Sequence, residues 1–112
     1  MSKSEPKPII ITLFYMDGCP PCRRFKTEWD IMVNNKETNK NFNFVKYESR
    51  ENIPESEIYI DGKNIIAEGF PTIKVKVFEQ QHVYVHNERT SKGIFTFIKR
   101  ILQKYSSVDI SR

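Results

Sequence analysis

The sequence lacks the features of membrane, repetitive or disulfide-stapled proteins. It has only 2 cysteines, 2 histidines and 1 tryptophan. No apolar run approaches the length that spans a membrane, and there is no N-x-S/T acceptor, internal repeat or low-complexity segment. The polar, proline-bearing stretch 1–8 has no apolar signal region, so we expect a cytoplasmic location. These absences leave one globular domain within the 112 residues.

The charge balance does not favour nucleic acid as a partner, and the lack of a membrane-spanning run leaves no membrane partner expected. Lys+Arg number 18 against 14 Asp+Glu, a formal excess of +4 that is scattered along the chain. Arg23, Arg24 and Lys26 do cluster just after the cysteines. They could stabilise a thiolate or steer acidic partners, or they could be the solvated face of a helix.

The two cysteines lie in the motif Cys19-Pro20-Pro21-Cys22. An apolar run from Ile9 to Tyr15 precedes it and predicts a strand covered on both faces. The apolar positions that follow have helical spacing, at Phe25, Trp29 and then Met32 or Val33. The pattern predicts a strand, a tight turn and a helix from Pro20 to about Asn34 or Asn35, with both sulfurs in the first helical turn.

This placement favours thiol chemistry. Side chains three apart on a helix are neighbours, so Cys19 and Cys22 can form a disulfide with little backbone movement. The unpaired N–H groups at a helix N-terminus favour a thiolate over a thiol, and Cys19 is the outer of the two residues. Proline is tolerated in the first helical turn because its missing N–H has no acceptor there.

After the first helix, Phe42 to Tyr47 predicts a second strand, which a right-handed β-α-β connection makes parallel to the first. The stretch 48–69 is irregular, with a short strand at 58–60 and a turn at Asp61-Gly62. The alternation in 73–77 predicts a strand with one buried face and one solvated face, the latter bearing Lys74 and Lys76.

A turn at 79–81 and a strand at 82–86 complete an antiparallel hairpin. Thr90 or Ser91 is the expected N-cap of a last helix. Its apolar stripe consists of Ile94, Ile98, Ile101 or Leu102, and Tyr105.

Two motifs in this order resemble the thioredoxin superfamily. Phe14-Tyr15 leads into Cys19-Pro20-Pro21-Cys22, and Gly69-Phe70-Pro71-Thr72 opens a strand. The resemblance implies an α/β thioredoxin fold, a central mixed β-sheet flanked by helices, over residues 9–105. Residues 1–8 and 106–112 are then expected to be tails.

The resemblance also implies thiol-disulfide exchange, with Cys19 as nucleophile and Cys22 as resolving cysteine. The proline that corresponds to Pro71 is cis in this family and packs beside the cysteines, where the neighbouring backbone accepts substrate. The expected substrate-binding residues are Gly18, Pro20, Phe70, Pro71 and Thr72. Implied partners are disulfide-containing proteins and an electron donor, either a thiol or a thioredoxin-reductase-like protein, and no cofactor or metal is expected.

The sequence departs from the family pattern near the motif. Gly18 stands where thioredoxins usually have tryptophan, and Leu13 where they have a buried acid that helps to deprotonate the inner thiol. Lys46 and Glu48 are the candidates to replace that acid. Thr27 replaces a helix-kinking proline.

Three other interpretations fit parts of the sequence. Cys19, Cys22, His82 and His86 form a nominal Cys₂His₂ zinc set, but the gap between the pairs is long and the histidines lie in a strand-like run. A cis Pro54 would instead indicate a glutathione-using glutaredoxin. Gly18 and Leu13 motivate a binding or assembly module whose cysteines form a static disulfide.

Overall fold

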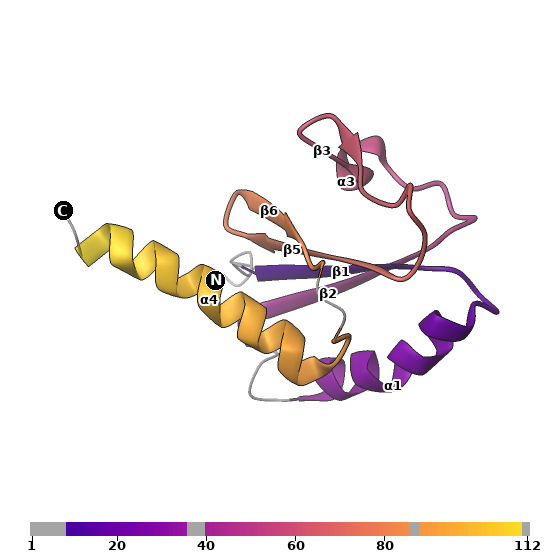
Figure 1. Cartoon of the computed structure of the whole chain (residues 1–112), viewed down its shortest axis with the longest axis horizontal. Coiled ribbons are helices and arrows are strands. Elements are labelled where there is room, and N and C mark those ends of the chain that lie inside the picture. The colour runs from indigo at the N-terminus through magenta and orange to yellow at the C-terminus, as the bar shows by residue number, and fades with distance from the viewer. Residues whose placement is uncertain (1–8, 36–39, 86–87, 111–112) are drawn as a thin grey trace, which may run out of the picture.

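The computed structural model describes residues 9–35, 40–85 and 88–110, with side chains up to residue 104. The predicted tail 1–8 lies outside the described residues. Four strands form one mixed sheet in the order β2-β1-β5-β6. These strands are β1 (Ile9–Tyr15), β2 (Phe42–Glu48), β5 (Thr72–Val77) and β6 (Gln80–Val83). The main helices are α1 (Pro20–Asn34) and α4 (Ser91–Ile110), both on one face of the sheet (Figure 1).

Strand β1 lies in the centre of the sheet. It pairs in parallel with β2, from Ile9↔Phe42 onward, and antiparallel with β5. The predicted β-α-β unit is therefore confirmed. Alternate side chains of β1 point to opposite faces, and both faces are covered, since Ile11 and Phe14 are each 0% exposed.

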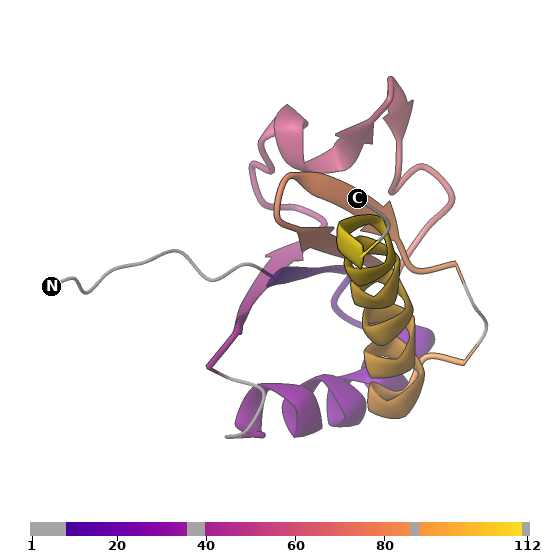
Figure 2. The same ribbon diagram turned by 90° about the vertical axis from the view of Figure 1, so that its left-hand side faces the viewer.

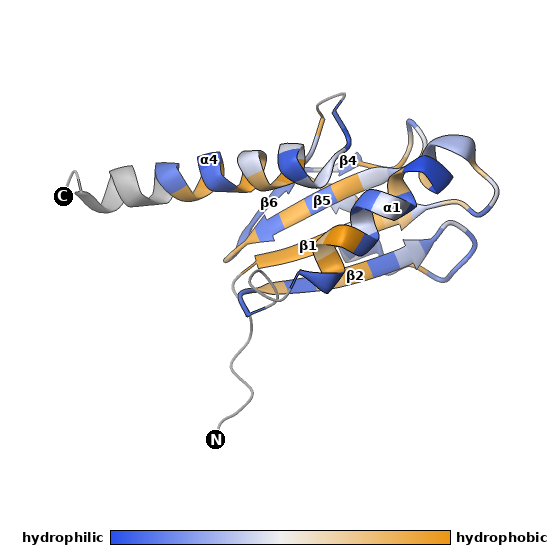
Figure 3. Ribbon diagram, turned by 90° about the horizontal axis from the view of Figure 1, so that it is seen from below, coloured by the Kyte–Doolittle hydropathy of each residue, from blue (hydrophilic) through white to orange (hydrophobic). Residues whose placement is uncertain are grey.

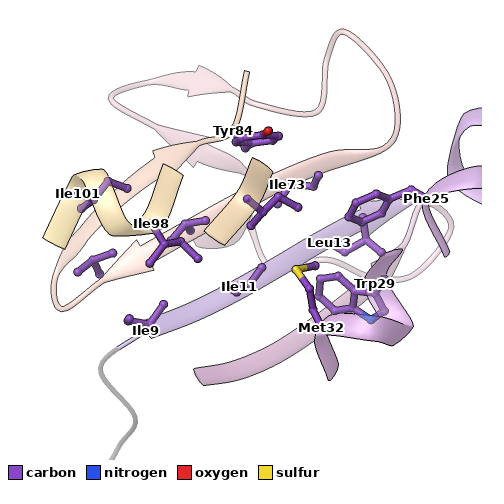
Figure 4. Packing of buried hydrophobic residues seen from close by; sticks show 13 residues of the cluster. Ile9, Ile11, Leu13, Phe25, Trp29, Met32, Ile73, Tyr84, Ile98 and Ile101 are labelled. Atoms are coloured by element: carbon purple, nitrogen blue, oxygen red, sulfur yellow. The ribbon is translucent and has the colours of Figure 1, made fainter. Parts of the chain in front are cut away.

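Helix α1 packs its apolar stripe against β1. Phe25, Trp29 and Met32 are buried and lie beside Leu13 (Figure 4). The helix begins with prolines in its first positions, as predicted. It ends at Asn34, where the following Asn35 has extended backbone and donates its N–H to the Met32 carbonyl.

Helix α4 covers the rest of the same face. The hydroxyl of Thr90 accepts a hydrogen bond from the Gly93 N–H at 3.0 Å, which makes Thr90 the N-cap. Ile94 and Ile98 are buried on the side that faces the sheet, and the apolar colouring of α4 follows that side in Figure 3. The helix extends to Ile110, past the expected domain end at residue 105. No helix in the described parts of the chain is long and apolar enough to cross a membrane.

The irregular stretch between β2 and β5 forms three short elements on the other side of the sheet (Figures 1 and 2). They are α3 (Glu55–Ile58), β3 (Tyr59–Ile60) and β4 (Lys63–Asn64). Strands β3 and β4 form a hairpin through Asp61 and Gly62, whose φ angles are 53° and 80°. The strand predicted at 58–60 thus starts one residue late, because Ile58 ends α3.

The expectation of a solvated face on β5 was wrong for Lys74, which is 2% exposed. Its ammonium donates to the Glu57 carbonyl at 2.7 Å and to the Glu57 carboxylate at 3.1 Å. Buried charges require such partners, and α3, which supplies this one, was not visible in the sequence pattern. The hairpin that follows also turns earlier than predicted, at Phe78 and Glu79, so that β6 spans Gln80–Val83 rather than 82–86.

Truncation of the α4 stripe should destabilise the fold strongly. Ile98 is 2% exposed, so we expect Ile98→Ala to lower the free energy of unfolding by about 2–5 kcal/mol through lost burial and a residual cavity. Val85→Ala, at a side chain that is 76% exposed, is the matched control and should change it by less than about 0.5 kcal/mol. Urea unfolding measures both, and equal effects would contradict the packing described here.

Candidate active site

The turn between β1 and α1 holds Cys19 at the helix N-cap. The Cys19 N–H donates to the Met16 carbonyl at 3.2 Å, and Gly18 within this turn has a φ of +82° that favours glycine. The Cys19 carbonyl accepts the Arg23 N–H at 3.0 Å, which starts the helix. The Cys19 side chain makes no capping hydrogen bond and is partly exposed. It is therefore held in position and accessible to another molecule.

A cis peptide bond lies across from this thiol. The bond between Phe70 and Pro71 is cis, in agreement with the family resemblance, and it is the only cis bond among the described residues. The Cys19 sulfur lies 3.9 Å from the Phe70 carbonyl oxygen. The peptide bond before Pro54 is not cis. The glutaredoxin interpretation, which required a cis Pro54, therefore has no support.

The cis-proline turn is positioned by its own hydrogen bonds and by the sheet. The Thr72 hydroxyl donates to the Gly69 carbonyl at 2.8 Å across the turn. Phe14 pairs with Thr72 in the β1–β5 ladder. Because β1 leads into the cysteines and β5 follows the proline, this register fixes the two turns side by side.

Cys22 lies one helical turn behind Cys19 and has a different environment. Its sulfur accepts the Met16 N–H at 3.5 Å. Burial raises the pKa of the Cys22 thiol, and the neighbouring Cys19 raises it further. The Met16 N–H and the positive charge of Arg89 lower this pKa, but by less. The net effect keeps Cys22 protonated over a wider pH range than an ordinary cysteine.

A cavity of about 180 Å³ borders Cys22. Its lining residues are Leu13, Tyr15, Met16, Asp17, Gly18, Cys22, Arg23, Lys26, Trp29 and Lys46. Leu13 contributes an apolar side chain, and Lys46, its partner in the β1–β2 ladder, is one of the two residues that the sequence offered as a proton-transfer partner of Cys22. Lys46 thus shares a cavity with Cys22, whereas Glu48 does not line it.

Glu48 anchors the turn instead. Its carboxylate accepts the Asp17 N–H at 3.2 Å, and Arg50 donates to it both from the backbone, at 2.8 Å, and from the guanidinium. These hydrogen bonds, above all the one from the Arg50 backbone, lower the pKa of Glu48 to about 2. Arg50 also contacts the Asp17 carboxylate at 3.3 Å. The cluster joins the end of β2 to the turn that carries Cys19.

The described residues contain no group of three or more His, Cys, Asp and Glu side chains that could hold a metal ion. His86 lies outside the described residues. The His82 ring packs edge-on against Phe97 of α4, and its Nε2 is buried with no hydrogen-bond partner in the described part of the chain. His82 therefore belongs to the interface between the sheet and α4.

The predicted site residues thus fall into two adjoining turns. Gly18, Cys19, Pro20 and Cys22 lie in the first, and Phe70, Pro71 and Thr72 in the second. Two contributions were not anticipated. Glu48 anchors the turn through hydrogen bonds to Asp17 and Arg50 that exist only in the folded chain. The hydrogen bond to the Cys22 sulfur comes from the backbone N–H of Met16, which almost any residue at that position would supply.

Comparisons with known proteins agree with this architecture. No protein-family model and no curated protein matches the sequence. Among 58 matching solved chains is the first thioredoxin domain of mouse protein disulfide-isomerase A4, with 20% identity, a TM-score of 0.60 and coverage of 85% of this chain and 64% of that one. A fragment of ERdj5 has 13% identity, a TM-score of 0.63 and coverage of 87% and 44%.

Oxidised thioredoxin from Plasmodium falciparum also matches, with 19% identity, a TM-score of 0.53 and coverage of 88% of this chain and 82% of that one. The chain spans less than two thirds of the length of the first two structures, 64% of one and 44% of the other. At these identities the likeness establishes the architecture. The chain has the thioredoxin fold, an α/β structure with a mixed central sheet flanked by helices.

The low pKa of Glu48 predicts a pH dependence of stability. Its folded value of about 2 lies below the ordinary 4.5. The carboxylate therefore stabilises the folded state above pH 4.5, and this contribution is lost as the pH falls toward about 2. We expect Glu48→Gln to be less stable than wild type at neutral pH and to lose less stability over that acid range. Urea unfolding at several pH values measures this.

The matched control is Glu55→Gln, at an exposed carboxylate of α3. This variant should follow the wild-type pH profile. If Glu48→Gln also followed the wild-type dependence of stability on pH, the Glu48 cluster would not stabilise the turn.

Proposed function

We propose that the protein is a thiol-disulfide oxidoreductase that acts on disulfides of protein substrates. The observation that carries this proposal is the position of the partly exposed Cys19 sulfur, 3.9 Å from the carbonyl oxygen before cis-Pro71. This carbonyl and the turn around it offer backbone groups to an extended substrate segment next to the nucleophile. Gly18, Pro20 and Phe70 would contact that segment, while Thr72 would act by holding the turn.

The first step is attack by the Cys19 thiolate on one sulfur of a substrate disulfide. A bond forms between Cys19 and that sulfur, the substrate S–S bond breaks, and the released substrate thiolate takes a proton. The attacking sulfur sits at the N-terminus of α1. Pro20 and Pro21 have no N–H to offer it, so the Cys22 N–H is the first of this helix that can face the thiolate.

The second step is attack by Cys22 on the Cys19 sulfur. Cys22 gives up its proton, the Cys19–Cys22 bond forms, and the second substrate thiol leaves. The substrate disulfide has then gained two electrons and two protons, and the cysteine pair has lost them. The raised pKa of Cys22 delays this step, and the Met16 N–H and the charge of Arg89 favour the thiolate that it requires.

We propose reduction as the physiological direction, since no histidine lies between the cysteines to stabilise a thiolate strongly. A reductant of this kind needs a thiol or a thioredoxin-reductase-like protein to return it to the dithiol form. A reducing compartment such as the cytoplasm supplies such donors.

Reduction of insulin disulfides by dithiothreitol tests the activity. Wild type should accelerate the reaction, and Cys19→Ser should reduce the rate to that of dithiothreitol alone, since the attacking sulfur is gone. Cys22→Ser should accumulate mixed disulfides with insulin, because the second step is removed. An intact fold with no acceleration by wild type and no captured insulin would favour a binding module with a static disulfide.

The charge of Arg89 should affect only the second step. We expect Arg89→Gln to slow release of the mixed disulfide by about two- to tenfold, because one solvent-exposed charge changes a pKa by about one unit or less. Stopped-flow measurement of both steps would separate them, and formation of the mixed disulfide should be unchanged. Arg100→Gln, on the exposed surface of α4, is the charge-matched control, and equal effects of the two variants would contradict a local role for Arg89.

A further inference from the structure

The peptide unit between Tyr15 and Met16 contacts the Cys22 sulfur. Its N–H, which belongs to Met16, donates to that sulfur at 3.5 Å. Its carbonyl accepts the N–H of Ser49, the residue after β2, at 2.8 Å. A trans peptide unit is planar and its N–H and C=O point in opposite directions, so the bond to Ser49 also directs the N–H at the sulfur. A hydrogen bond to a sulfur favours its thiolate form.

The next peptide unit, between Met16 and Asp17, lies between the Glu48 carboxylate and the backbone of Cys19. The Asp17 N–H donates to the carboxylate at 3.2 Å. The Met16 carbonyl accepts the Cys19 N–H at 3.2 Å. Because the two peptide units share the Met16 Cα atom, the orientation of the second restricts that of the first. Glu48 therefore helps to orient the backbone that contacts both cysteines.

The Glu48 carboxylate is itself held in place by several donors. Glu48 is 7% exposed. Besides the Asp17 N–H, its carboxylate accepts the Arg50 N–H at 2.8 Å, the Arg50 guanidinium at 3.1 Å and the Ser49 hydroxyl at 3.3 Å. These hydrogen bonds, the one from the Arg50 backbone above all, lower the pKa of Glu48 to about 2. A carboxylate with this pKa is too weak a base to take the Cys22 proton at neutral pH, so an effect of Glu48 on that thiol must pass through the turn.

The charge of Glu48 alone would act in the opposite direction. Charged side chains from the active-site turn, α1 and β2 line the cavity beside the Cys22 sulfur, namely Asp17, Arg23, Lys26 and Lys46. Arg89, which precedes α4, adds a positive charge that favours the thiolate. Glu48 does not line this cavity, and a negative charge can only disfavour a thiolate. Direct electrostatics therefore predicts that a neutral residue at position 48 leaves the Cys22 thiolate unchanged or favours it.

We propose that Glu48 is a positioning residue for Cys22 and acts on it through the two peptide units that flank Met16. Its carboxylate fixes the active-site turn, so that the Met16 N–H stays directed at the Cys22 sulfur while that sulfur becomes the attacking thiolate. This inference rests on the proposed function, because it concerns the second exchange step. It adds a residue at the end of β2 to the groups that determine the rate of that step.

Exchange with dithiodipyridine, a small uncharged disulfide, tests the proposal without a protein substrate. Cys19 releases one thiopyridone when it forms the mixed disulfide. Cys22 then releases the other in an intramolecular step, whose rate does not depend on the concentration of the reagent. Stopped-flow absorbance measures both steps, and their pH profiles are recorded from about pH 5 to 9, around the ordinary range of thiol titration.

We expect Glu48→Gln to slow the second step by about two- to fivefold near neutral pH, part of what a whole hydrogen bond to a charged group contributes. The glutamine amide has one acceptor oxygen in place of two, so it cannot satisfy all the donors around it. The pH profile of the second step should move to higher pH, and the first step should change by less than about twofold. The matched control is Asp17→Asn, which removes a negative charge from the same turn and keeps the backbone N–H that Glu48 binds. Its second step should be at least as fast as that of wild type.

A backbone variant removes the same link without changing any charge. Ligation of a synthetic segment 1–18 to the chain that begins at Cys19 allows an ester oxygen to replace the Asp17 N–H. This full-length chain should show the same slower second step as Glu48→Gln. The two changes combined should have no larger effect than either alone, because both break one hydrogen bond. Near-ultraviolet circular dichroism verifies that each chain is folded.

A second step in Glu48→Gln that is as fast as in wild type, or faster, would overturn the proposal. Equal slowing of both steps, or additive effects of Glu48→Gln and the ester, would also overturn it. Local unfolding would move the pH profile of Cys22 to lower pH, since the burial that raises the pKa of this thiol would be lost. The expected dithiodipyridine results without any reduction of insulin would reject the proposed function and leave the positioning role of Glu48 intact.

Discussion

The pairing of β1 with β5 is the constraint on which the candidate site depends. The two turns that meet there are far apart in the sequence, one ending at Cys19 and the other containing Pro71. The ladder that pairs Phe14 with Thr72 brings the Cys19 sulfur to 3.9 Å from the Phe70 carbonyl oxygen. A shift of one residue would exchange the faces of β1 and bury Thr12 against α1 in place of Leu13. The same register of β1 and β5 therefore produces both the hydrophobic core and the candidate site.

The two cysteines differ in their surroundings because they occupy different positions at the N-terminus of α1. Cys19 is at the N-cap and faces the cis-proline turn, where another chain can approach. Cys22 lies within the first turn of the helix, beside the Met16 N–H and a cavity with an apolar contribution from Leu13. Burial raises the pKa of Cys22. Position alone thus gives two chemically identical side chains different surroundings.

Elements with a strong local pattern could be predicted from the sequence, and those that depend on tertiary contacts could not. The run 9–15 and the helical spacing after Cys19 predicted β1 and α1 with their observed bounds, and the motif around Pro71 predicted the cis turn. The buried position of Lys74 was missed because its partner Glu57 belongs to a helix of four residues with no periodicity. Glu48 was considered for proton transfer, while its observed contacts are with Asp17 and Arg50.

Both main helices lie on one face of the sheet. The Lys74–Glu57 pair explains why the centre of the opposite face is nevertheless buried. Phe14 is 0% exposed on that second face, where it stacks on Tyr47 and lies under the Lys74 ammonium, 5.8 Å from the ring centroid. The ammonium in turn holds α3 through the Glu57 carbonyl and carboxylate. A cavity of about 320 Å³ on the same face is lined by Ser56 and Glu57 of α3 and by Lys74 itself. One ion pair therefore holds α3 over this face and keeps its centre covered.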